Sequence, residues 1–156
     1  IVPFVGQNHG ANEHGRVQRT RRISNRLAFA YAGTTLLLLL PTARFFSGWF
    51  SDDPVVVRLS ATYLIIATFG HAGVYLVNWM SQLLSVIGKP RPVMAINLTR
   101  VFAFVIPLSL LGSHFFGYTG LVVGLALGNL FSGAHAYLTT RRQLRQLNIV
   151  NQRPQR

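Results

Sequence analysis

The sequence predicts an all-α integral membrane protein with four full transmembrane helices and part of another at its N-terminal end. Half of the 156 residues are hydrophobic and 12% are charged, against roughly 25% charged residues in ordinary soluble domains. The mean hydropathy is +0.36. Long, nearly uncharged stretches alternate with short polar segments. These features argue for helices that span a bilayer, and against both a soluble fold and disorder.

The composition also excludes several classes of function. The chain has no cysteine and only three carboxylates, Glu13, Asp52 and Asp53. It contains no P-loop, no paired carboxylates in a span and no Ser/His/Asp set, so we expect no enzyme, no catalytic residue, no metal site and no cofactor. The net charge of +12 would suit a nucleic-acid-binding protein. The basic residues are split between distant clusters, however, so they form no continuous basic face and we expect no nucleic-acid partner.

The first two segments are a partial helix and a full span. Residues 1–10 are too few to cross a bilayer, which takes about 20, and they lack the charged region of a signal peptide. We interpret residues 1–12 as the end of a helix that starts before the chain, so the sequence resembles a C-terminal fragment. The first full span is predicted at about 27–46, which includes the apolar run Leu36–Leu40.

The second span is predicted at about 55–88. Asp53 followed by Pro54 is typical of a helix N-cap with proline at the first helical position. The uncharged run 59–88 has 30 residues and would be about 45 Å long as a helix, so it must tilt or protrude. Gly88 suits the residue after a helix C-terminus, and Pro90 prevents the helix from continuing.

Two further spans follow, at about 93–111 and 118–140, with a short turn at 112–117. Pro107 predicts a kink in the third span. A polar segment closes the chain, and we assign residues 146–156 to a cytoplasmic tail.

The positive-inside rule gives the topology. Twelve of the 15 basic residues lie in segment 11–26, in loop 88–92 and in the C-terminal segment. These are alternate connections between the predicted spans. The remaining basic residues are Arg44 and Arg58, which flank loop 47–54, and Arg100, inside the third span. We therefore expect the C-terminus to be cytoplasmic, in a bacterial inner (plasma) membrane, with the basic segments contacting anionic lipid headgroups.

The second span carries a polar stripe at helical spacing. Its members recur every three or four residues and share one face of a helix: Thr68, His71, Tyr75, Asn78, Gln82 and Ser85. Lipid penalises exposed polar groups, so this face should meet protein or a water-filled cavity. Two interpretations remain open, which are cavity lining and hydrogen bonding that holds the bundle together. Histidine is the one residue type in the stripe that is a common pH switch, although a lone histidine is more often a packing residue.

Arg100 is a charged residue well inside a predicted span, whereas Arg44 and Arg58 lie near the ends of theirs. It lies about eight residues inside the third span, or roughly 12 Å deep. Its side chain could reach the cytoplasmic interface or a cavity, where an ionisable residue is a functional candidate. Asn97 is one turn away and could share the binding partner of Arg100.

The fourth span contains a ridge of small residues at four-residue spacing, namely Gly120, Gly124, Gly128, Ser132 and Ala136. Small residues at this spacing let two helix backbones approach closely. We expect the ridge to serve packing.

Three segments together resemble a known family. Pro3-Phe4-Val5-Gly6-Gln7-Asn8-His9-Gly10-Ala11 is similar to the P-x-x-G-Q-N-x-G-A signature of the multidrug and toxic compound extrusion (MATE) transporters. Residues 49–54 look like the family's outer loop. Gly88-Lys89-Pro90-Arg91-Pro92, followed by Asn97 and Arg100, resembles its next cytoplasmic turn and the start of the helix that follows. The resemblance extends to about Arg145.

The resemblance implies a twelve-helix transporter with two six-helix lobes. Residues 1–145 would be the C-terminal part of the second lobe, from the end of helix eight through helix twelve, and the missing N-terminal lobe would be a partner. The implied function is export of small organic, often cationic, compounds in exchange for Na⁺ or H⁺ by alternating access. Gln7 and Asn8, with Thr68, His71, Tyr75, Asn78, Gln82, Asn97 and Arg100, would line the cavity. The span at 55–88 has no Asp or Glu, unlike members that carry a coupling carboxylate in helix ten.

Two other functions remain as alternatives. One is a flippase of the same superfamily that moves lipid-linked precursors, which an arginine-lined cavity would favour. The other is a small four-helix structural membrane protein.

Overall fold

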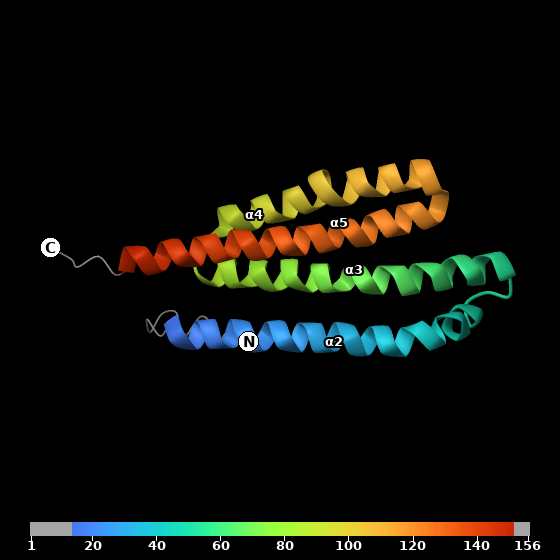
Figure 1. Cartoon of the computed structure of the whole chain (residues 1–156), viewed down its shortest axis with the longest axis horizontal. Helices are drawn as coiled ribbons and strands as arrows, with labels where there is room; N and C mark the ends of the chain where they lie inside the picture. Colours follow the sequence, from blue (N-terminus) through green and yellow to red (C-terminus); the bar gives the residue numbers. More distant parts are fainter. Residues whose placement is uncertain (1–13, 152–156) are drawn as a thin grey trace.

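The computed structural model describes residues 14–151, which are helical except at short turns (Figure 1). In order, the elements are α2 (His14–Gly48), α3 (Pro54–Val86), α4 (Pro90–Thr99), the π-helix η1 (Arg100–Val105) and α5 (Ile106–Asn151). That part of the chain contains no strand. The partial helix expected at 1–12 lies outside the described residues, as does the end of the predicted tail.

Three helical stretches in the described part are long and apolar enough to cross a membrane: Phe29–Gly48, Pro54–Val86 and Pro90–Arg145. The last has 56 residues, about 84 Å if straight and therefore far longer than a bilayer is thick. It folds back at Gly117, where the backbone is not helical. Figure 1 shows the resulting antiparallel arrangement of α2, α3 and the two parts of the stretch 90–145. The prediction of an all-α membrane fold is confirmed. We call residues 90–116 the outgoing arm and residues 118–151 the returning arm.

Helix α2 begins at His14, well before the predicted start of its span at residue 27. Nothing in segment 14–26 breaks a helix, so the backbone continues through the basic cluster. At 35 residues the helix is about 52 Å long and exceeds the hydrocarbon thickness of about 30 Å. The charged first turns can therefore protrude from the apolar layer. Pro41 lies inside the helix and does not end it.

Both ends of α3 follow the local chemistry that the sequence predicts. Asp53 is the N-cap, and its carboxylate accepts a hydrogen bond of 2.7 Å from the Val55 N–H, while Pro54 occupies the first turn. At the other end Gly88 adopts φ 71°. The Lys89 N–H donates to the Leu84 carbonyl at 2.9 Å, and the Gly88 N–H to the Ser85 carbonyl at 3.1 Å. This pair of bonds is a Schellman motif, which satisfies carbonyls left unpaired at the helix end.

The third span differs from the prediction in two respects. The turn expected at 112–117 is wrong for residues 112–116, which remain helical, so that Gly117 alone breaks the helix. Gly112 and Gly120 are in backbone contact across the bend, and this packing favours a short reversal. The irregularity expected at Pro107 occurs just before it, as the π-helix 100–105.

The ridge of small residues packs as predicted. All five members are buried, and the three glycines lie against the outgoing arm. A Cβ atom on Gly120 would overlap the Gly112 carbonyl, one on Gly124 would overlap the Leu108 carbonyl, and one on Gly128 would lie 2.8 Å from the Val105 Cα. The two arms are therefore in direct backbone contact.

The returning arm also contacts α3 closely on another face. A Cβ atom on Gly73 would overlap the Asn129 carbonyl, and one on Gly133 would lie 2.7 Å from the Gly73 Cα. The Tyr118 hydroxyl donates to the Leu59 carbonyl at 3.2 Å. A core cluster lies toward the other end of α3: Val77, Met80, Leu84, Ile87, Ile96 and Ala136. The returning arm therefore packs against α3 on one face and against the outgoing arm, which includes η1, on another.

Candidate functional site

A pocket of about 330 Å³ lies between α3, η1 and the returning arm. Its polar lining residues are Tyr63, His71, Arg100 and Asn129, and its apolar ones are Ala67, Val74, Val101, Val105 and Leu125. His71 and Arg100 are both residues that the sequence marks as candidates. The fold brings them to the same pocket from two helices that are distant in sequence.

Arg100 is half-buried and points to the returning arm. Its Nε–H donates to the Asn129 Oδ1 at 3.2 Å, and the Asn129 Nδ2 donates to the Leu125 carbonyl at 3.0 Å. Asn129 is only 7% exposed. This bond holds the arginine toward the bundle, so the structure favours the cavity over the cytoplasmic interface for its side chain. The expectation that Asn97 shares the partner of Arg100 is wrong, because Asn97 is exposed and donates to the Val93 carbonyl of its own helix.

His71 and Thr68 differ in their access to the pocket. Thr68 is buried and donates to the Leu64 carbonyl at 2.6 Å. The His71 Nδ1 lies 2.9 Å from the Ala67 carbonyl. A carbonyl only accepts hydrogen bonds, so Nδ1 must carry a proton and Nε2 is the nitrogen that is free to interact. Thr68 therefore supports the helix, whereas His71 lines the pocket.

The last three members of the polar stripe, Asn78, Gln82 and Ser85, lie on an open face of α3. Between His71 and Val86 the exposed side chains of this helix are all polar, namely His71, Asn78, Gln82 and Ser85. Tyr75 is half-buried and meets Tyr31 of α2 edge to face, with ring centroids 5.4 Å apart. Over residues 71–86, the apolar side of α3 thus packs against neighbouring helices, and its polar side is uncovered by the described residues.

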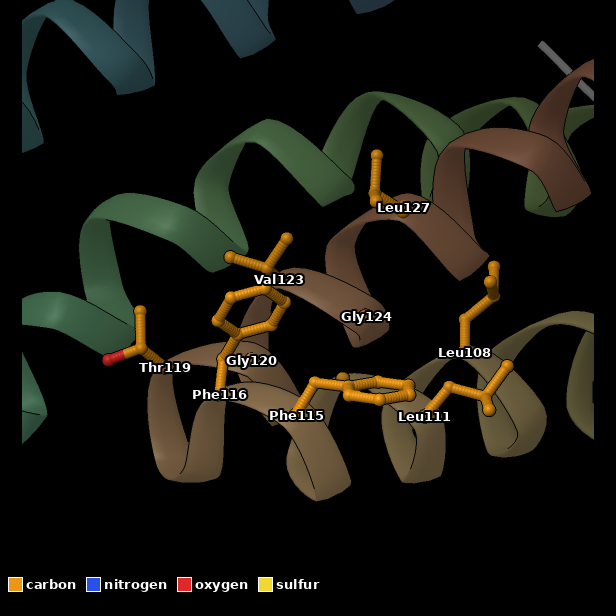
Figure 2. A pocket seen from close by; sticks show the side chains of 10 residues that line it. Leu108, Leu111, Phe115, Phe116, Thr119, Gly120, Val123, Gly124 and Leu127 are labelled. Atoms are coloured by element: carbon orange, nitrogen blue, oxygen red, sulfur yellow. The ribbon is translucent and has the colours of Figure 1, made fainter.

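A second hollow, of about 590 Å³, lies between the two arms near Gly117. Figure 2 shows Leu108, Leu111 and Phe115 from the outgoing arm facing Gly120 and Gly124 of the returning arm. Thr119 supplies the only hydroxyl among its lining residues, and Phe115 and Phe116 are 70% and 76% exposed. With almost no polar group to orient a ligand, this hollow is typical of a lipid-facing surface rather than of a specific site.

Tyr63 and Asn129 also line the Arg100 pocket, although neither is among the candidates that the sequence predicts. A polar residue in an apolar span is itself a signal of function or pairing, and that signal was present for Asn129. Asn129 lies outside the ridge of small residues, which is the more regular pattern in the same span. Gln7 and Asn8, which the resemblance assigns to the cavity, lie outside the described residues.

These features define a helical membrane protein with a polar pocket between its long apolar helices and a polar helix face that is open. The sequence model of the MATE family matches residues 1–111. The chain therefore belongs to the MATE family.

Individual relatives agree with this assignment. The chain is 27% identical to the probable multidrug resistance protein NorM of Agrobacterium fabrum, over 96% of this chain and 33% of the relative. It superimposes on the crystal structure of the Vibrio cholerae MATE transporter VcmN in the bent form with a TM-score of 0.91 and 25% identity, covering 95% of this chain and 34% of that one. An aspartate-to-asparagine mutant of VcmN gives a TM-score of 0.90 at 25% identity, over 93% of this chain and 33% of the mutant. The chain spans about a third of the length of these relatives.

Proposed function

We propose that this chain is part of an antiporter that exports small organic, often cationic, compounds in exchange for Na⁺ or H⁺ by alternating access. The observation that carries the proposal is the open polar face of α3. Between His71 and Val86 the uncovered side chains are polar while the apolar ones are packed, which is the reverse of a lipid-facing helix. Such a face belongs against a water-filled cavity or against the missing N-terminal lobe.

The chemistry of this face suits a broad range of organic cations. Histidine, tyrosine and amide side chains supply hydrogen bonds in several directions, and the Tyr31–Tyr75 pair offers aromatic surface that attracts a cation. Of the described carboxylates, Asp52 is exposed before α3 and Asp53 caps that helix. We therefore assign cation coupling to neither of them.

The position of the pocket also supports transport. His71 lies near the middle of α3, a 33-residue helix, and so roughly 25 Å from either end. Arg100 opens the π-helix on the opposite wall. Sites at the bilayer midplane beside irregular helices are common in secondary transporters, and π-helices frequently occur at functional sites. A precursor flippase would favour several arginines around the cavity, whereas Arg100 is the one arginine among the described pocket residues.

We propose an inner-membrane location with a cytoplasmic C-terminus. A reporter fused after Arg156 should be cytoplasmic, and one inserted near Ser51 should be external, because the basic residues cluster on alternate connections. Paired phosphatase and fluorescent-protein fusions measure this in cells. Finding both reporters on the same side of the membrane would contradict the topology.

The cavity assignment is tested by labelling the open face. In the intact protein, Asn78→Cys should react with a membrane-impermeant thiol reagent, because water must reach this exposed position in at least one state of the transporter. A transported organic cation such as tetraphenylphosphonium should slow the reaction several-fold. Labelling kinetics in membrane vesicles, followed by mass spectrometry, measure both effects.

The matched control for this experiment is Phe69→Cys. Phe69 lies on the same helix and is 50% exposed, but it is apolar. The half-buried Leu76 gives a second comparison with a less accessible position. If Asn78→Cys reacts no faster than Phe69→Cys and no faster than Leu76→Cys, the polar stripe has a structural role and the cavity assignment fails.

A further inference from the structure

Arg100 is a charged group at depth in the membrane without a carboxylate beside it in the described part of the chain. It lies ten residues after Pro90, where α4 begins, and therefore roughly 15 Å along that helix, about half the hydrocarbon thickness. The two described carboxylates, Asp52 and Asp53, belong to the loop before α3. A cation at this depth is costly and is normally paired.

The hydrogen-bonding capacity of Arg100 is only partly used within the pocket. A guanidinium has five N–H donors, and Nε donates to Asn129 Oδ1. The Asn129 amide nitrogen is engaged with Leu125, so Asn129 is held with its oxygen toward the arginine. The two Nη groups remain, and they form a planar fork of the kind that pairs with a carboxylate through two parallel hydrogen bonds.

The surroundings of this fork are mixed in character. Across the pocket stand His71, whose Nδ1 faces its own helix, and Tyr63. Apolar side chains complete the lining of the 330 Å³ volume. A cationic fork at the edge of an apolar hollow complements a group that is anionic at one end and apolar over the rest.

We propose that the Arg100 pocket binds a carboxylate carried on an apolar body, with the two Nη groups donating to its two oxygens. The carboxylate comes from a free ligand or from an Asp or Glu side chain of another segment in the intact transporter. The proposal rests on the proposed function only because it assumes that this chain is part of a larger transporter. It does not require the protein to transport the carboxylate.

The test measures binding of radiolabelled benzoate to the intact, detergent-purified protein, with neutral benzamide as the isosteric competitor. Arg100→Gln should weaken benzoate binding about tenfold or more, because it removes the positive charge and the two-pronged hydrogen bonding of the fork. Benzamide should not compete. Arg58→Gln is the matched control, since it removes the same charge from an exposed position outside the pocket and should leave the affinity within about twofold. Arg100→Lys keeps the charge without the fork and should bind several-fold more weakly, which covers the case in which Arg100→Gln fails to fold.

The two sources of the carboxylate give different results. A site open to free ligands binds benzoate in the wild type. A site occupied by a side chain binds none until the responsible Asp or Glu is neutralised to Asn or Gln, and the binding that then emerges again requires Arg100. Benzoate binding that is independent of Arg100, or absent from the wild type and from every neutralised variant, overturns the proposal. Binding is measured without an ion gradient, so a failure here leaves the labelling result for Asn78, and with it the proposed function, unaffected.

Discussion

Gly124→Leu should remove most of the folded protein. Any side chain at this position overlaps the Leu108 carbonyl, and its Cβ atom would also lie 2.8 Å from the Ser109 Cα. The Leu108 carbonyl and the Ser109 Cα both belong to the backbone and cannot move aside as a side chain would. The two arms must therefore separate, and the neighbouring Gly112–Gly120 contact would be lost as well. The cost should exceed the roughly 1–3 kcal/mol typical of an overpacked core. The yield of monodisperse protein in detergent and its thermal stability measure the effect.

The matched control adds the same side chain where there is room. Gly33 lies on α2 and is exposed, and a Cβ atom there meets no described atom within 4 Å. Gly33→Leu should therefore keep a near-normal yield. Equal yield and thermal stability for Gly33→Leu and Gly124→Leu would show that the two arms are not in close contact in the membrane.

The second large effect is expected at the bend between the arms. Gly117 has φ 59° and ψ −140°, a conformation that is essentially restricted to glycine. A Cβ atom there would meet nothing within 4 Å, so Gly117→Ala tests backbone strain without a clash. We expect a loss of about 1–3 kcal/mol, measured as a lower midpoint of thermal unfolding. Gly48→Ala is the control, because Gly48 also has open space around it and has no positive φ. Equal midpoints for the two variants would mean that the bend tolerates an ordinary residue.

The parts of the fold that local chemistry determines could be predicted from the sequence. Asp53 and Pro54 place the start of α3 because an N-cap and a first-turn proline act within a few residues. Gly88 places its end for the same reason. The small-residue ridge was equally accessible, since four-residue spacing puts its members on one helix face whatever the partner helix is.

The parts that depend on tertiary contacts could not be predicted. The helix persists to residue 116 because the packing of Gly112 on Gly120 stabilises it, although residues 112–117 would favour a turn in water. The π-helix 100–105 has no local signature beyond Pro107 two residues later. The partner of Arg100 is 29 residues away on another arm, so only the folded chain distinguishes Asn129 from the nearer Asn97. The placement of the cavity-lining stripe remains a prediction, which the Asn78 labelling addresses.

The π-helix has a consequence for how this segment tolerates a change in length. An α-helix turns about 100° per residue, and a π-helix accommodates an additional residue in its turn. Deleting one residue between Val101 and Val105 would restore a regular α-helix and rotate everything before it by roughly that angle. The glycine contacts beyond Val105 would keep their register, while Arg100 would swing away from Asn129. The deletion of one residue would therefore be enough to turn Arg100 away from the pocket.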